Sequence, residues 1–74
     1  MNDAADLVRF WRQQRGMSQA RLAELAGTGQ AAISRIESGR DLPTLTLLDR
    51  IASALDCQLT VAFTSGSGQI PPSA

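Results

Sequence analysis

The 74-residue sequence has no histidine, no lysine and no tyrosine, and its single cysteine is Cys57. One cysteine cannot form an internal disulfide, and a chain without histidine lacks the usual ligands of zinc and other transition metals. The side chains that most often transfer protons in enzymes are also scarce. We therefore expect a protein that is not an enzyme and that needs no metal and no cofactor.

Long apolar runs are absent as well. No stretch approaches the roughly 20 residues that span a bilayer, and Met1–Asp6 lacks the basic start and apolar run of a signal peptide. We therefore expect a cytoplasmic protein with no membrane partner.

A chain of 74 residues has room for one domain. Such a domain buries only about 60% of its unfolded surface, so contacts with a partner would add stability.

The formal net charge is zero, which by itself argues against electrostatic binding of nucleic acid. The charges are segregated, however. Between Arg9 and Arg40 six arginines oppose two glutamates, for a local net charge of +4, and the remainder of the chain carries −4. A basic binding surface and an ordinary solvated face both fit this pattern, so the choice between them depends on the motifs.

Apolar residues at helical spacing predict four short helices. With their capping residues, they run from Asp3 or Asp6 to Gln14, from Ser18 to Ala26, from Gln30 to Ser38 and from Thr44 to Leu55. We expect Trp11 to lie in the core of the protein. The second and fourth helices are expected to bury two stripes, namely Leu22, Ala23, Leu25 and Ala26, and Leu45, Leu48, Ile51, Ala52 and Leu55.

After Asp56 the apolar residues alternate, which predicts a half-buried strand over 57–63. A lone strand needs a partner for its backbone groups, and the simplest one is the same strand of a second copy. We therefore expect a homodimer held by Leu59, Val61 and Phe63. Cys57 is expected to be a buried strand residue, because no basic residue is adjacent to activate its thiol. Residues 1–64 then form one domain, and residues 65–74 have the composition of a disordered tail.

Two short amphipathic segments between Ser18 and Gly39 flank a Gly-Thr-Gly turn, an arrangement that suits insertion of a helix into DNA. Ile33 and Ile36 are the inward apolar residues of the second segment. The residues left facing outward are small or polar types that read bases, namely Gln30, Ala31, Ser34 and Arg35.

Several segments agree in order and spacing with the XRE family of helix-turn-helix proteins, which includes Cro and phage repressors. The resemblance covers about residues 7 to 55 and is carried by Gly16-Met17-Ser18-Gln19, Leu22-Ala23, Ile33 to Arg40 and Pro43-Thr44-Leu45. The continuation into residues 57–63 is similar to the HipB branch, antitoxins that pair with HipA kinases. The resemblance implies a mainly α fold: a four-helix helix-turn-helix domain followed by one β-strand that pairs across a homodimer.

The resemblance also implies roles for individual residues. Gln30 suits adenine, Ala31 the methyl group of thymine, and Arg35 guanine, whereas Ser34 can reach a base or a phosphate. Helix N-termini attract phosphate, and the expected phosphate contacts are Gln19, Thr28, Gly29, Ser38 and Arg40.

Arg12 and Glu37 match a family pair in which an arginine of the first helix bridges to the end of the third helix and orients it. The alternative is two exposed charges whose interaction is worth under about 1 kcal/mol. Three further arginines either contact DNA or cover solvated faces, namely Arg9, Arg15 and Arg21.

The leading hypothesis is a dimeric repressor that places two recognition helices in successive major grooves of a palindromic operator. The HipB-like strand adds that the protein autoregulates its operon as the antitoxin of a type II toxin–antitoxin pair, with a HipA-like kinase as the toxin. Two alternatives are an interaction protein that restrains a partner enzyme, with DNA binding secondary, and a stand-alone phage-type regulator. No small-molecule effector is expected, because no additional domain is present to hold one.

Overall fold

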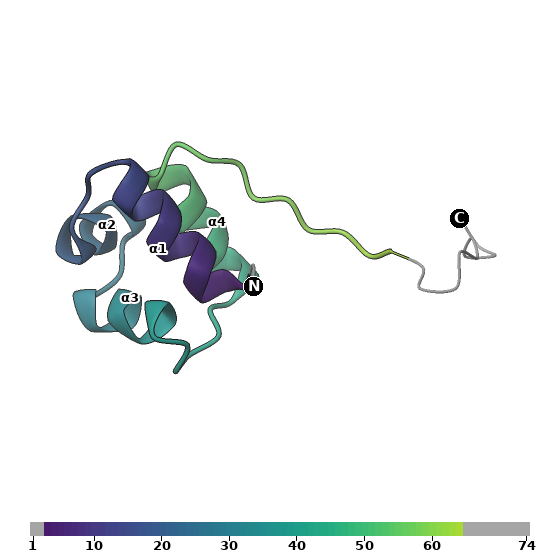
Figure 1. Ribbon diagram of the computed structural model, residues 1–74, viewed down its shortest axis with the longest axis horizontal. Coiled ribbons are helices and arrows are strands. Elements are labelled where there is room, and N and C mark those ends of the chain that lie inside the picture. The colour runs from purple at the N-terminus through teal and green to yellow at the C-terminus, as the bar shows by residue number, and fades with distance from the viewer. Residues whose placement is uncertain (1–2, 65–74) are drawn as a thin grey trace.

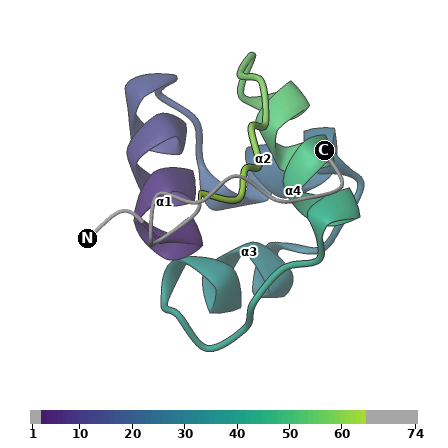
Figure 2. The same ribbon diagram turned by 90° about the vertical axis from the view of Figure 1, so that its right-hand side faces the viewer.

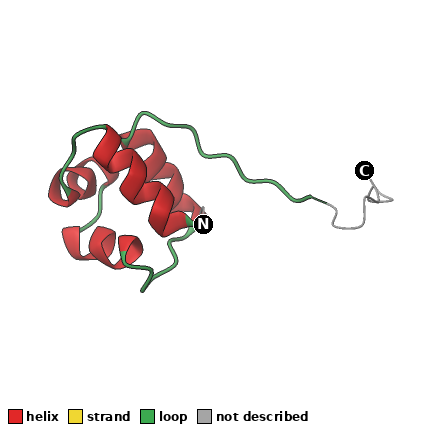
Figure 3. Ribbon diagram, in the orientation of Figure 1, coloured by secondary structure: helices red, strands yellow, loops and turns green. Residues whose placement is uncertain are grey.

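The computed structural model describes residues 3–64 of the chain, and its regular structure is entirely helical (Figure 1, Figure 3). The four helices are α1 (Ala4–Gln14), α2 (Gln19–Ala26), α3 (Gln30–Glu37) and α4 (Leu45–Ala54). The four predicted helices are thereby confirmed. The tail over 65–74, expected to be disordered, lies outside the described residues. No helix within residues 3–64 is long and apolar enough to cross a membrane.

Side-chain oxygens begin three of the four helices. Asp3 Oδ1 accepts the Asp6 amide at 3.0 Å, so Asp3 is the N-cap of α1 and Asp6 lies in its first turn. Ser18 and Thr44 cap α2 and α4 in the same way, accepting backbone amides at 3.0 and 3.1 Å. α3 begins after Gly29 with no side-chain cap, and the amides of its first two residues, Gln30 and Ala31, have no acceptor within residues 3–64.

The helices enclose a small core in which α2 packs against α3 and α4, and α1 packs against α3 (Figure 2). Leu22, Ile33 and Ile51, from α2, α3 and α4, are the largest side chains that are fully buried. Five further residues complete the core: Val8, Ala23, Ala26, Ile36 and Leu55. Each helix therefore buries one stripe, as the spacing of apolar residues predicts.

Some residues expected in the core lie at its edge. Trp11 is 36% exposed, because its ring borders a groove between α1 and α4 that these helices do not close. Leu25 is 46% exposed at the margin of the buried stripe of α2, and Leu45 is 59% exposed as the first residue of α4. The prediction of burial was wrong at these positions, since spacing along one helix does not say where a neighbouring helix ends.

Three arginines connect the C-terminal ends of helices to other parts of the fold. Arg50 Nε donates to the carbonyl of Ala26 at 2.9 Å, and Arg15 Nε donates to that of Leu55 at 2.7 Å. Arg9 donates to the carbonyl of Glu37. The last carbonyls of a helix have no partner within it and carry partial negative charge, so a guanidinium stabilises them. Arg9 and Arg15, which belong to the basic window from Arg9 to Arg40, therefore make structural contacts.

The segment over 57–64 leaves α4 and extends away from the helices (Figure 1). It forms no strand within the described residues, and a single chain offers no neighbouring strand for it. Val61 and Phe63 are 59% and 103% exposed. Cys57 is half-buried, but the expectation that nothing basic is near it was wrong, because Arg15 Nη2 lies 3.8 Å from its Sγ. Pairing of this segment across a dimer stays a prediction.

Candidate nucleic-acid interface

α2, the turn over 27–29 and α3 form the helix-turn-helix unit. Gly27 ends α2 with φ at 73°, in the left-handed region that favours glycine, and the Thr28 amide donates to the carbonyl of Ala23 at 2.9 Å. Ile33 and Ile36 then anchor α3 on the core. The opposite face of α3 is exposed and carries the expected base-reading residues, Gln30, Ala31, Ser34 and Arg35.

A buried carboxylate holds α3 in position. Glu37, at the last turn of α3, is 4% exposed and accepts a bidentate pair of hydrogen bonds from Arg12 of α1, at 2.6 and 2.9 Å. Gln19 Nε2, at the start of α2, donates to the same carboxylate at 3.1 Å. A further hydrogen bond joins Arg12 Nη1 to the carbonyl of Met17 at 2.9 Å. The structure therefore brings Arg12 and Glu37 together and joins three helices at one charge.

The environment keeps this carboxylate ionised. Burial alone raises the pKa of Glu37, but hydrogen bonds from Arg12 and Gln19, together with the charges of Arg12 and Arg9, outweigh it. The pKa of Glu37 therefore lies below its ordinary value. The hydrogen bond to Glu37 also raises the pKa of Arg12. Both partners are fully charged at neutral pH, and their planar geometry fixes the direction in which α3 leaves the core.

Among the expected phosphate contacts, Gln19 and Ser38 have side chains that make hydrogen bonds within residues 3–64. The side chain of Gln19 is half-buried and its amide donates to Glu37. Thr28 and Gly29 precede α3 at its uncapped N-terminus. Ser38 Oγ donates to the carbonyl of Arg35 at 3.1 Å. Arg40 is exposed, and its side chain makes no hydrogen bond or ion pair within residues 3–64.

Arg35 has a partner that the sequence did not indicate. Its Nε lies 2.7 Å from Oδ2 of Asp41, in the loop that follows α3. Asp41 follows directly after Arg40 in the sequence and is one of the acidic residues that balance the charge of the basic window. Arg21 likewise pairs with Glu24 on α2. Most arginines of the basic window are therefore engaged within the protein, and the local charge of +4 overstates the number of free cations.

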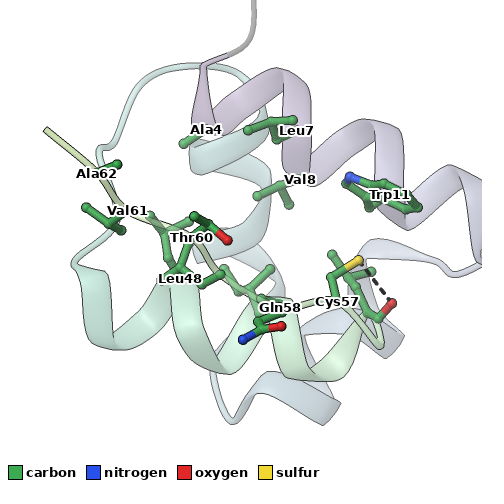
Figure 4. Close-up of a pocket in the computed structure, with 14 residues that line it drawn as sticks. Ala4, Leu7, Val8, Trp11, Leu48, Cys57, Gln58, Thr60, Val61 and Ala62 are labelled. Carbon is green, nitrogen blue, oxygen red and sulfur yellow. Dashed lines mark hydrogen bonds between the residues drawn. The ribbon is translucent and has the colours of Figure 1, made fainter. Parts of the chain in front are cut away.

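The expected dimerisation residues lie along or beyond an apolar groove of about 540 Å³ between α1, α4 and the segment over 57–62 (Figure 4). Leu59 and Val61 line this groove, opposite Leu7 and Trp11 of α1. Phe63 lies outside it and is fully exposed. The structure thus leaves apolar surface uncovered on both the groove and the segment.

The chain has the helix-turn-helix fold of DNA-binding transcriptional regulators. Residues 8–61 match the model of the helix-turn-helix family HTH_3, and the chain belongs to this family.

Relatives among curated proteins are regulators and antitoxins. Antitoxin HipB of Escherichia coli K12 is 37% identical over 57 residues, which cover 77% of this chain and 65% of HipB. The competence pilus inhibition repressor of Acinetobacter baylyi is 31% identical over 61 residues, which cover 82% of this chain and 56% of the repressor. The chain thus spans less than two thirds of the length of either relative.

Similar solved structures are also those of a repressor and of HipB. HipB in a HipA–HipB–O2–O3 complex has a TM-score of 0.70 at 32% identity, covering 88% of this chain and 96% of that chain. The P22 c2 repressor, solved with a synthetic operator, has a TM-score of 0.72 at 26% identity, covering 78% of this chain and 88% of that chain. The similarity to HipB supports the HipB-like branch that the sequence indicates.

The Glu37 network predicts a specific dependence of stability on pH. A carboxylate whose pKa is lowered in the folded state contributes stability above its unfolded pKa of about 4.3, and this is lost as the pH falls through the folded pKa. We expect Glu37→Gln to cost about 3 kcal/mol of unfolding free energy at pH 7, because it removes one partner of a buried pair. Below about pH 5, the unfolding free energy of this variant should also change less with pH than that of the wild type.

Urea unfolding at a series of pH values and one protein concentration measures both effects. Glu24→Gln, which breaks the exposed pair with Arg21, is the matched control and should change stability by less than about 0.5 kcal/mol. If the unfolding free energies of the wild type and of Glu37→Gln fell equally steeply with pH in the acid range, the lowered pKa of Glu37 would be contradicted.

Proposed function

We propose that this chain is a sequence-specific repressor that binds double-stranded DNA by placing α3 in the major groove. The observation that carries the proposal is the exposed outer face of α3, whose orientation is fixed by the buried Arg12–Glu37 pair. Membership of the helix-turn-helix family and similarity to the P22 c2 repressor support it. A protein bound in this way over a promoter occludes it.

In this proposal three side chains of α3 read bases directly. The amide of Gln30 pairs with adenine, the guanidinium of Arg35 pairs with O6 and N7 of guanine, and the methyl group of Ala31 contacts that of thymine. Ser34 contacts a base or a phosphate. Two alanines at 31 and 32 leave little polar surface there, so discrimination depends mainly on Gln30 and Arg35.

Phosphate contacts flank the base-reading face. Thr28 and Gly29 lie at the uncapped N-terminus of α3, where free amide groups and the helix dipole favour an anion. The side-chain amide of Gln19 has two N–H donors, and one of them donates to Glu37, so the other is left for a phosphate. Beyond the other end of α3, Ser38 and Arg40 complete the set.

The proposed repressor is a homodimer in which the segments over 57–63 of two copies pair as antiparallel strands. Its support is the exposed apolar surface of Val61 and Phe63 and the open groove that Leu59 lines. Pairing satisfies backbone groups that a single chain leaves unpaired. A two-fold axis through the strands presents two copies of α3 to successive major grooves of a palindromic operator, about one helical turn apart.

A second proposal concerns a protein partner. The similarity to antitoxin HipB, and the coverage of 96% of the HipB chain in the HipA–HipB complex, favour an antitoxin that represses its own operon and binds a HipA-like kinase. Two alternatives differ from it. In one, neutralising the partner is the main activity and DNA binding is secondary. In the other, the chain is a phage-type regulator with no toxin.

Base reading by α3 predicts a loss of sequence preference in two variants. Arg35→Ala and Gln30→Ala should each lower the preference for the operator over a scrambled duplex by about tenfold, because each removes a bidentate base contact. Mobility-shift titration at one salt concentration measures the preference. Asp49→Asn on α4, which lies beside the C-terminal end of α2 rather than beside α3, is the control and should keep this preference. Unchanged preference in both α3 variants would exclude direct readout by this helix.

Strand pairing predicts that a charge at Val61 disrupts the dimer. Val61→Asp should shift the sedimentation coefficient toward the monomer and weaken operator binding, because the carboxylate enters a packed apolar face. Thr64→Asp places the same charge just beyond the predicted strand and outside the groove, and it should leave the dimer intact. An unchanged dimer in Val61→Asp would remove strand pairing from the proposal.

The antitoxin proposal predicts a stable complex with the product of the adjacent gene. Co-expression of the two chains followed by size-exclusion chromatography without DNA should give one co-eluting peak, and growth should be inhibited when the partner is expressed alone. A stable complex that neutralises the partner although this chain binds no operator would favour the interaction-protein alternative. Independent elution of the two chains and no inhibition of growth would favour the stand-alone regulator.

A further inference from the structure

Asp41 lies beside the proposed guanine-reading residue, and no contact proposed above uses it. Its Oδ2 is 2.7 Å from Arg35 Nε, and the two side chains are about half exposed, at 50% and 48%. An exposed pair of this kind adds little to stability. Its contact with Arg35, on the exposed outer face of α3, points instead to a role in recognition.

The loop after α3 is built to keep Asp41 in this place. Gly39 adopts a φ of 78°, which turns the chain back on the last turn of the helix. The amides of Arg40 and Asp41 then both donate to the carbonyl of Arg35, at 2.9 and 3.3 Å, and Ser38 Oγ donates to it at 3.1 Å. The backbone of Asp41 is therefore tied to the residue whose side chain it contacts.

This ion pair uses only Nε of Arg35 and leaves its two terminal nitrogens free. Asp41 engages Nε, and within the described residues neither Nη1 nor Nη2 of Arg35 has a hydrogen-bond partner. The two terminal nitrogens can therefore donate side by side to O6 and N7 of guanine while Nε stays with the carboxylate. Because the contact restricts the rotamers of a long side chain, less conformational entropy is lost when Arg35 meets the base.

The same carboxylate opposes binding that does not involve guanine. A negative charge close to the phosphate backbone is repelled whatever the sequence, and a guanidinium already paired is a weaker attractant for phosphates. We propose that Asp41 is a positioning residue for guanine recognition, which acts through Arg35 to raise the ratio of specific to non-specific binding. This inference rests on the proposed function of α3 in reading DNA.

Selection from a random-sequence double-stranded DNA library tests the inference. The wild-type full chain should enrich a site with a guanine that Arg35→Ala no longer prefers. Asp41→Asn should weaken the preference for this same guanine by up to about fivefold, the upper range for an exposed ion pair, without lowering affinity for a scrambled duplex. Asp41→Glu keeps a carboxylate and should restore part of the preference.

Two controls separate positioning from general effects. Glu24→Gln removes the carboxylate of another exposed arginine pair, with the same change in net charge, and should keep the guanine preference. In an Arg35→Ala background, Asp41→Asn should change base preference no further, because Asp41 acts through Arg35.

The outcomes distinguish this inference from the proposed function. If the wild type enriches a site and Asp41→Asn keeps its full guanine preference, the inference fails and the proposed function stands. A uniform loss of affinity for all sequences with a lower melting temperature would assign Asp41 a structural role and also overturn the inference. If the wild type enriches no sequence, both fail together.

Discussion

The orientation of α3 depends on one buried carboxylate, that of Glu37. A charge removed from water must be paired and hydrogen-bonded, and its partners come from Arg12 and Gln19 on two other helices. Apolar side chains could fill such a site with equal or greater stability. What the bidentate pair adds is direction, because a planar guanidinium and a planar carboxylate meet in few relative orientations. The outer face of α3 is therefore presented at a defined angle.

The remaining arginines show why a neutral chain with a basic segment is not a simple cationic surface. The four helices have 8 to 11 residues, shorter than an isolated helix needs to be stable in water. Arg9, Arg15 and Arg50 satisfy carbonyls at the ends of three of them from elsewhere in the fold. In the proposed repressor, electrostatic attraction to DNA therefore depends on few residues near α3, and binding depends more on how α3 is oriented.

Local signals in the sequence predicted the helices correctly, because a cap such as Ser18 or a glycine such as Gly27 acts within a few residues. Contacts between distant residues were accessible only where a family resemblance pointed to them, as with Arg12 and Glu37. Spacing could not indicate the pairing of Arg35 with Asp41, since it depends on the left-handed turn at Gly39. The exposure of Trp11 was missed because it depends on how far α1 and α4 stand apart.

The open groove links the folding of the proposed repressor to its recognition of DNA. A small chain with Trp11 and Val61 partly exposed has an incomplete core, and in the proposed homodimer a second copy covers the groove and completes this core. The same proposed pairing duplicates α3, and two copies double the few base contacts proposed for one helix. Because both effects run through the segment over 57–63, stability and operator affinity should rise together with protein concentration. A low concentration of the chain then both weakens repression and favours unfolding, which couples the amount of protein to the activity of the promoter.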